Sequence, residues 1–126
     1  MPLKLGVLGI DHGHIFGMLS SMKAQGCTCD AYWTDGAAVT EDKFNQVFPD
    51  VAKTDDRRRI LDDPGISMIL ISAVPADRAG LAMEAMEAGK DVMVDKPGCT
   101  SLEQLAAIKE VQARTGRIWT VNFSER

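Results

Sequence analysis

LKLGVLG, from Leu3 to Gly9, is a short apolar run that ends in glycine, and HIFGMLSSMKAQ, from His14 to Gln25, follows it after a link of four residues. The apolar run is typical of a strand that is buried on both faces. In the second segment Ile15, Met18 and Leu19 recur at spacings of three and four, which is the pattern of an amphipathic helix. The beginning of the chain therefore predicts a strand, a glycine turn and a helix.

The same alternation continues along the chain. The segment ISMILIS, Ile66–Ser72, is apolar nearly throughout and is the most strand-like stretch. Strands and helices that alternate about six times indicate a parallel sheet with helices on both faces. We therefore predict an α/β fold, a doubly wound, Rossmann-like parallel sheet in three α/β/α layers. Further strands are expected at 29–33, 51–53, 91–94 and 118–121, and further helices at 40–48, 55–61 and 77–88.

Two helix starts carry explicit signals. Thr40 is the expected cap of the helix that follows it. The last helix begins with a capping box, formed by Thr100 with Glu103 or by Ser101 with Gln104. Along that last helix the spacing predicts four inward-facing side chains: Leu102, Leu105, Ile108 and Val111.

Composition is that of an ordinary single-domain protein. The 126 residues are 45% hydrophobic and carry a net charge of −4, which disfavours a broad nucleic-acid footprint. No apolar run approaches the roughly 20 residues needed to span a bilayer, and the first residues lack the apolar core of a secretion signal. Three cysteines without framework spacing fit a reducing compartment. We expect a cytoplasmic domain with neither nucleic-acid nor membrane partners.

The loop after the first predicted strand is a candidate nucleotide site. In a parallel sheet this position opens a helix, whose N–H groups and dipole favour an anion. Against the fingerprint G-x-G-x-x-G, Gly9 matches the first glycine, whereas Asp11 and His14 occupy the other two positions. Asp11 would repel a pyrophosphate, a charge that His12 or His14 could offset when protonated. A cofactor loop that includes Gly13 and an ordinary strand-to-helix turn both remain open.

Asp35 follows the second predicted strand, 26 residues after Gly9. An acid near this spacing can accept hydrogen bonds from the adenosine ribose and would disfavour a 2′-phosphate. In that role Asp35 favours NAD over NADP. A solvated turn aspartate before Gly36 explains the residue about equally well.

Histidines and cysteines raise the question of a metal. His12 and His14 form a His-x-His pair, and Cys27 and Cys29 form a Cys-x-Cys pair. An entire predicted helix separates the two pairs, so they are expected at opposite ends of it. We therefore predict no metal site from these residues.

The segment AMEAGKDVMVDKPG, Ala85–Gly98, runs from a helix through a short strand into Lys96-Pro97. It resembles the "AleAGKHVlvEKPl" signature of the Gfo/Idh/MocA oxidoreductases, the family of glucose–fructose oxidoreductase and inositol dehydrogenase. Ala73-Val74-Pro75 stands where that family has "atP", and Val121-Asn122 with Arg126 resembles its "vnfxxR" ending. The resemblance covers nearly all of the chain, and the Lys-Pro stretch is its most specific part.

The resemblance implies an NAD(P)-binding Rossmann domain over residues 1–126, followed in the family by a substrate and catalytic domain that these residues do not include. It implies hydride transfer between the nicotinamide and a secondary alcohol or ketone of a sugar or cyclitol, in a homo-oligomeric enzyme. Lys96 matches the signature lysine and is the candidate catalytic residue. Pro75 and Pro97 match the family's prolines, and Gly9 and Asp35 match its cofactor-binding positions.

The chain also departs from the family pattern. Asp95 replaces the usual glutamate before the lysine, Ala76 replaces the asparagine after Pro75, and the downstream histidine is missing. Two alternatives follow from these departures and from Asp11. One is a Rossmann module that has lost its nucleotide and serves ligand sensing or assembly. The other is a phosphoacceptor signalling domain, which would need an acid pair and a central aspartate that this sequence lacks.

Overall fold

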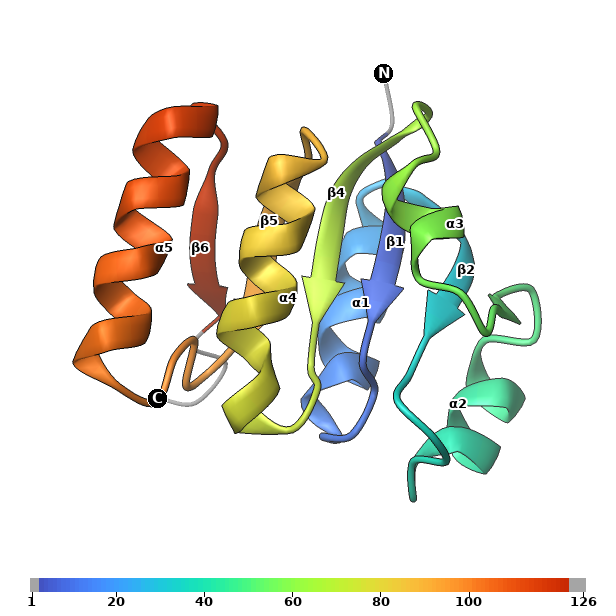
Figure 1. Ribbon diagram of the computed structural model, residues 1–126. Coiled ribbons are helices and arrows are strands. Elements are labelled where there is room, and N and C mark those ends of the chain that lie inside the picture. Colours follow the sequence, from blue (N-terminus) through green and yellow to red (C-terminus); the bar gives the residue numbers. More distant parts are fainter. Residues whose placement is uncertain (1–2, 123–126) are drawn as a thin grey trace.

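The computed structural model describes residues 3–122, which form a six-stranded parallel sheet in the order β3-β2-β1-β4-β5-β6 (Figure 1). Helices cover both faces, which confirms the predicted doubly wound α/β fold. The strands are β1 (Lys4–Leu8), β2 (Thr28–Trp33), β3 (Ala52–Lys53), β4 (Ile66–Ile71), β5 (Asp91–Asp95) and β6 (Trp119–Asn122). The helices are α1 (His14–Ala24), α2 (Glu41–Val47), α3 (Arg58–Leu61), α4 (Pro75–Glu87) and α5 (Leu102–Thr115).

The strand order reverses between β1 and β4. From β1 the chain adds β2 and β3 on one side, and it then crosses to β4 and continues to β5 and β6 on the other side (Figure 1). In open α/β sheets ligands bind at the carboxyl ends of the strands, at such a switch point. The loops after β1 and β4 therefore border the expected crevice.

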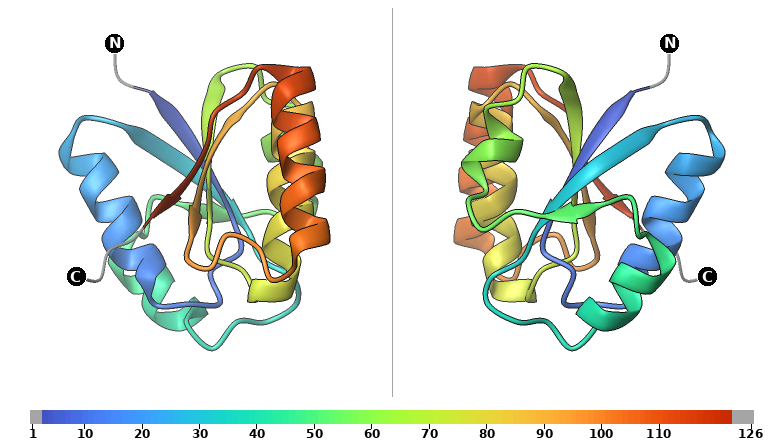
Figure 2. Two further views of the ribbon diagram at one scale, coloured as in Figure 1. Left: turned by 90° about the vertical axis from the view of Figure 1, so that its left-hand side faces the viewer. Right: turned by 90° about the vertical axis from the view of Figure 1, so that its right-hand side faces the viewer.

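The helices form two layers, one on each face of the sheet (Figure 2). Each layer buries a separate apolar cluster. One layer holds α1 and α2, where Ile15, Leu19 and Phe44 pack on the sheet. The other holds α3, α4 and α5, where Leu61, Ala82 and other buried residues pack on the opposite face. Each central strand is thus covered on both sides, which explains why β4 reads as a nearly continuous apolar run.

Most predicted boundaries are correct to within one or two residues, but two detailed predictions are wrong. The Thr40 side chain does not cap α2; its hydroxyl donates to the Ile10 carbonyl oxygen and ties this loop to the end of β1. Leu102 is 84% exposed rather than inward-facing. Residues spaced by three drift by about 60° per step around a helix of about 3.6 residues per turn, so Leu102 lies on the opposite side of α5 from the buried Val111.

Other predictions of helix ends are confirmed or refined. The Gln104 N–H donates to Ser101 Oγ at 3.0 Å, so Ser101 is the cap of α5, while the Gln104 side chain accepts from the Thr100 N–H. The fourth helix begins at Pro75, two residues before the expected Asp77. Arg126 of the predicted family ending lies outside the described residues. None of the helices within residues 3–122 is long and apolar enough to cross a membrane.

Candidate functional site at the carboxyl edge of the sheet

Gly9 joins three strands at the switch point. Its N–H donates to the Trp33 carbonyl at 2.6 Å, and its carbonyl accepts the Ser72 N–H at 3.2 Å. Its φ is +88°, and a Cβ at this position would lie 2.4 Å from the Cβ of Ala73. Only glycine combines this backbone conformation with such a close approach. The first fingerprint position thus has the tight turn that its sequence predicts.

The rest of the loop differs from a glycine-rich one. The His12 N–H donates to the Ser72 carbonyl at 3.1 Å, and the His14 N–H donates to the Nδ1 atom of the His12 ring at 3.1 Å. The loop's own side chain therefore satisfies one of the amides that open α1. Gly13, the residue before α1, is exposed, and a Cβ there would meet nothing within 4 Å.

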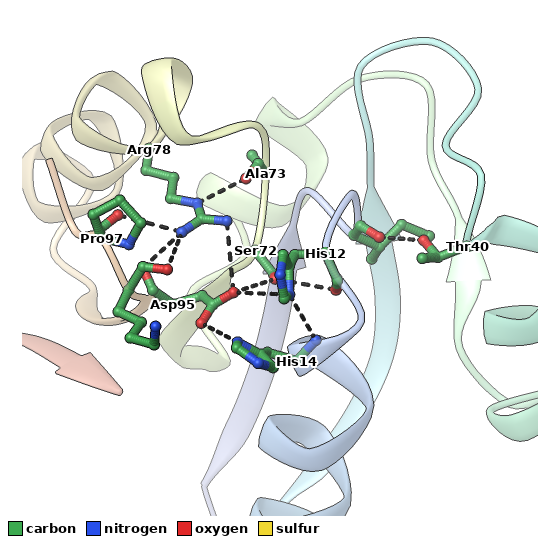
Figure 3. Close-up of polar contacts among 10 residues, drawn as sticks. His12, His14, Thr40, Ser72, Ala73, Arg78, Asp95 and Pro97 are labelled. Carbon is green, nitrogen blue, oxygen red and sulfur yellow. Dashed lines mark hydrogen bonds and ion pairs between the residues drawn. The ribbon is translucent and has the colours of Figure 1, made fainter. Parts of the chain in front are cut away.

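Two of the predicted residues meet at the end of β5. His14 Nδ1 lies 2.9 Å from Asp95 Oδ1, and His12 Nδ1 lies 3.5 Å from Asp95 Oδ2 (Figure 3). The Asp95 side chain is fully buried. The third fingerprint position is therefore occupied by a histidine that reaches across the switch point to β5.

Arg78 is a buried residue of the candidate site that sequence reasoning missed. It lies in the first turn of α4 and is only 1% exposed. Its guanidinium donates to the carbonyl oxygens of Ala73 (2.7 Å), Asp95 (3.0 Å) and Lys96 (2.7 Å), and to that of Pro97 at 3.3 Å (Figure 3). Burial lowers the pKa of this guanidinium, whereas the negative charges of Asp95 and Asp11 act in the opposite direction.

The buried Arg78 and Asp95 form one charged unit. Arg78 Nη2 lies 3.5 Å from Asp95 Oδ2, and the Ser72 hydroxyl donates to the same oxygen at 3.2 Å. A buried charge is tolerated only when it is paired and hydrogen-bonded, and both conditions are met here. The unit fixes the backbone of the Asp95-Lys96-Pro97 turn, in which the Lys96–Pro97 peptide bond is cis. One signal was available: Arg78 shares a helix face with the buried Ala82 and Ala85.

A cavity of about 550 Å³ lies on the other side of the switch point, between β2 and α4. Asp35 lines it after β2, Asp11 after β1, and Asp77 in the first turn of α4. Burial raises the pKa of the Asp11 carboxyl, and the negative charges of Asp35 and Asp77 raise it further. Pro75 lies between two further lining residues, Val74 and Ala76.

Arg57 is the cation that lines this cavity, and it is already engaged. Its Nε donates to both carboxylate oxygens of Glu84, at 3.0 and 3.1 Å. Its guanidinium carbon lies 5.2 Å from the centre of the Trp33 ring, within cation–π range. The cavity therefore has an aromatic and cationic wall beside a rim of carboxylates.

The predicted site residues thus fall into two groups. Asp11 and Asp35 line the cavity, whereas His12 and His14 lie beside the turn that carries Lys96 and Pro97. Gly9 holds the two groups together, and Gly13 contributes only backbone.

Comparison with known proteins supports the resemblance to the Gfo/Idh/MocA oxidoreductases that the sequence indicated. Residues 16–123 match the model of the Gfo/Idh/MocA oxidoreductase family, NAD-binding Rossmann fold, which begins just after the atypical glycine loop. Scyllo-inositol 2-dehydrogenase (NAD(+)) of Bacillus subtilis is 34% identical over 73 residues, covering 58% of this chain and 21% of that protein. The uncharacterized oxidoreductase YdgJ of Escherichia coli is 31% identical over 86 residues, covering 68% of this chain and 25% of that protein.

Solved structures of oxidoreductases share the fold of this chain. A candidate oxidoreductase from Erwinia carotovora atroseptica superposes with a TM-score of 0.93 at 32% identity, over 98% of this chain and 37% of that one. Biliverdin reductase from Synechocystis, solved with biliverdin and NADP+, has a TM-score of 0.80 at 20% identity, over 97% and 38%, and so shares the fold. The chain spans about a quarter or less of the two curated relatives named above. It belongs to the Gfo/Idh/MocA family of oxidoreductases and corresponds to the family's NAD-binding Rossmann domain.

Proposed function

We propose that this chain is the cofactor half of an enzyme that transfers hydride between NAD and a secondary alcohol or ketone of a sugar or cyclitol. The observation that carries the proposal is the cavity at the switch point, which is lined by Asp35 after β2 and Asp11 after β1. In dinucleotide-binding folds this position holds the adenosine ribose. The 34% identity to a scyllo-inositol dehydrogenase supports the substrate class.

The charges around the cavity favour NAD over NADP. Asp11, Asp35 and Asp77 contribute three carboxylates, and Glu84 contributes a fourth. A 2′-phosphate would add negative charge to this rim, and the Arg57 guanidinium that could offset it is paired with Glu84. The ribose hydroxyls of NAD can instead donate to Asp35.

Lys96 is the proposed catalytic residue of this domain. The nicotinamide supplies the hydride chemistry when it is bound. Arg78 holds the Lys96 carbonyl oxygen at 2.7 Å, and this fixes the backbone from which the ammonium group extends. A cation on a rigid turn can orient a substrate oxygen and stabilise negative charge on it. Pro97, in the turn after β5, and Pro75, at the start of α4, are proposed to border the cofactor at the carboxyl edge of the sheet.

The remaining parts of the proposal concern the whole enzyme. A second domain would supply the substrate pocket and the base that takes the hydroxyl proton, so residues 1–126 would not turn over alone. We also propose a cytoplasmic homo-oligomer without nucleic-acid or membrane partners.

Tryptophan fluorescence tests the cofactor proposal directly. Trp33 lines the cavity, so energy transfer to bound NADH should quench it during titration. We expect saturable quenching by NADH, weaker quenching by NADPH, and loss of the NADH signal in Asp35→Ala. Asp30→Ala is the matched control, because Asp30 is an exposed aspartate within β2 itself.

One observation favours the alternative of a Rossmann module without nucleotide. His12 already satisfies the His14 amide, and Asp11 places a carboxylate in the loop where a pyrophosphate would approach. If a folded protein binds neither NADH nor NADPH at millimolar concentration, this alternative replaces the enzyme proposal.

A further inference from the structure

Three side chains from two distant parts of the chain converge beside the Lys96 turn. His12 comes from the loop after β1, His14 is the first residue of α1, and Asp95 is the last residue of β5. One ligand-type atom from each lies within 4.8 Å of the other two, and the two imidazole ring centres are 4.1 Å apart (Figure 3). Two imidazoles and one carboxylate are a donor set that transition metals use in proteins.

The spacing suits a single ion. Zinc–nitrogen and zinc–oxygen bonds of about 2.0–2.2 Å place tetrahedral ligands about 3.3–3.6 Å from one another. The distances from Asp95 oxygens to His14 Nδ1 (2.9 Å) and to His12 Nδ1 (3.5 Å) lie close to this range. All three ligand-type atoms lie within 4.8 Å of one another, so the most distant pair would have to approach by about 1 Å to surround one centre.

Hydrogen bonds link the same atoms in the metal-free protein. The single Nδ1 lone pair of His12 accepts the His14 N–H, and this nitrogen lies 3.5 Å from the Asp95 carboxylate, beyond a good hydrogen bond. An ion bound through this nitrogen would replace the His14 N–H contact with a metal–nitrogen bond.

The surroundings of Asp95 are those of a metal-bound carboxylate. Ser72 and Arg78 hold Oδ2, which fixes the orientation of the carboxylate. Outer contacts of this kind orient ligands in known metal sites. The positive charge of Arg78 also weakens the attraction for a cation, so this carboxylate suits a site of moderate affinity.

Exposure shows where the site is open. The Asp95 side chain is fully buried, whereas those of His14 and His12 are 26% and 51% exposed. The histidine side therefore faces solvent, and further coordination positions would lie there, as in catalytic metal sites that keep an exchangeable ligand.

We infer that His12, His14 and Asp95 form a binding site for one divalent transition ion of the zinc class. The Cys27–Cys29 pair takes no part, since α1 separates it from the histidines as the sequence predicted. Asp95 supplies the ligand that no local motif contained. An ion bound here would offer a positive centre beside Lys96 for an oxygen of a bound molecule.

The site is tested on metal-free protein without a polyhistidine tag and without nucleotide. Zinc binding is measured by calorimetry, and Co²⁺ by its visible absorption, which reports coordination directly. We expect one ion per chain. Losing an outer-shell partner costs about 10- to 100-fold in metal affinity, so His12→Gln and His14→Gln should each weaken binding by about 100-fold or more.

Cys27→Ser is the matched control and should leave the affinity unchanged. Far-UV circular dichroism establishes that each variant is folded; the two histidine variants are decisive because Asp95 also pairs with Arg78. No Co²⁺ absorption at millimolar ion, or binding that survives both histidine substitutions, would overturn the inference. Because no nucleotide is present, that failure is separate from a failure to bind NADH.

Discussion

The two sides of the switch point are built in opposite ways. Between β2 and α4 lies an open cavity of about 550 Å³ lined by the carboxylates of Asp11, Asp35 and Asp77. Between β4 and β5 the Arg78–Asp95 pair is almost fully buried and every partner is within the protein. The first region has charge that a ligand must accommodate, and the second has charge that the fold has already neutralised.

This difference assigns separate tasks to the two regions. The carboxylates of the cavity select a ligand, because they accept hydrogen bonds from hydroxyl groups and repel phosphate groups. The buried pair holds the Asp95-Lys96-Pro97 turn in place, because Arg78 donates to consecutive carbonyl oxygens of that turn. Substitutions in the buried pair should therefore affect stability, and those in the cavity should affect affinity.

The largest effect is expected for Arg78→Ala. Removing one partner of a buried ion pair leaves an uncompensated charge and costs about 3–5 kcal/mol. Urea unfolding followed by circular dichroism measures this loss. Arg58→Ala is the control, since Arg58 is half-exposed and its ion pairs with Asp62 and Glu84 lie at the surface rather than in the core. Equal stability of the two variants would show that the buried pair does not stabilise the fold.

Gly9→Ala should come next. The positive φ costs an alanine about 1–2 kcal/mol, and the overlap with Ala73 adds about 1–3 kcal/mol of overpacking. Gly13→Ala in the same loop has a normal φ of −63° and open space, so it should be neutral or slightly stabilising. If Gly9→Ala is as stable as the original protein, the close approach of Gly9 to Ala73 is not required to hold the two regions together.

Asp11→Asn should change affinity with little effect on stability. Removing one charge near a bound diphosphate is worth about 1 kcal/mol in a solvated site, or roughly fivefold tighter NAD+ binding by calorimetry. Unchanged or weaker binding would mean that the carboxylate is turned away from the ligand.

The same residue predicts a pH dependence. The folded pKa of Asp11 is raised, so its protonation favours the folded state, and the stability this provides below the unfolded pKa is lost as the pH rises through the folded pKa. NAD+ affinity should likewise increase as the pH falls toward the range in which Asp11 protonates. Asp11→Asn should abolish this part of the profile, and an unaltered profile would assign it to another group.

The smallest effect concerns thiol reactivity. Burial raises the pKa of the Cys29 thiol to about 11, whereas Cys27 and Cys99 are half-buried. A disulfide reagent at mildly alkaline pH should modify Cys27 and Cys99 first and Cys29 only on unfolding. Mass mapping of the modified peptides checks the order, and early labelling of Cys29 would show that the β2 core opens easily.

Local patterns were sufficient for the architecture. Apolar runs ending in glycine, helical spacing and capping residues predicted the elements and the doubly wound sheet, because each signal acts within a few residues. Gly9 and Asp35 could be proposed in the same way, from their positions after strands. The resemblance of the Lys-Pro stretch added the family.

Tertiary structure alone decided how charges pair. Arg78 is 17 residues from Asp95, and His14 is 81 residues from it, so no local pattern could reveal that these side chains meet in a buried network. Thr40 was misjudged for the same reason, since its hydroxyl bonds to the Ile10 carbonyl after β1, whereas Leu102 was misjudged because a repeated spacing of three drifts around the helix. Short-range preferences determine which segments become strands and helices, but a buried charge finds its partner only when the sheet brings distant loops to one edge.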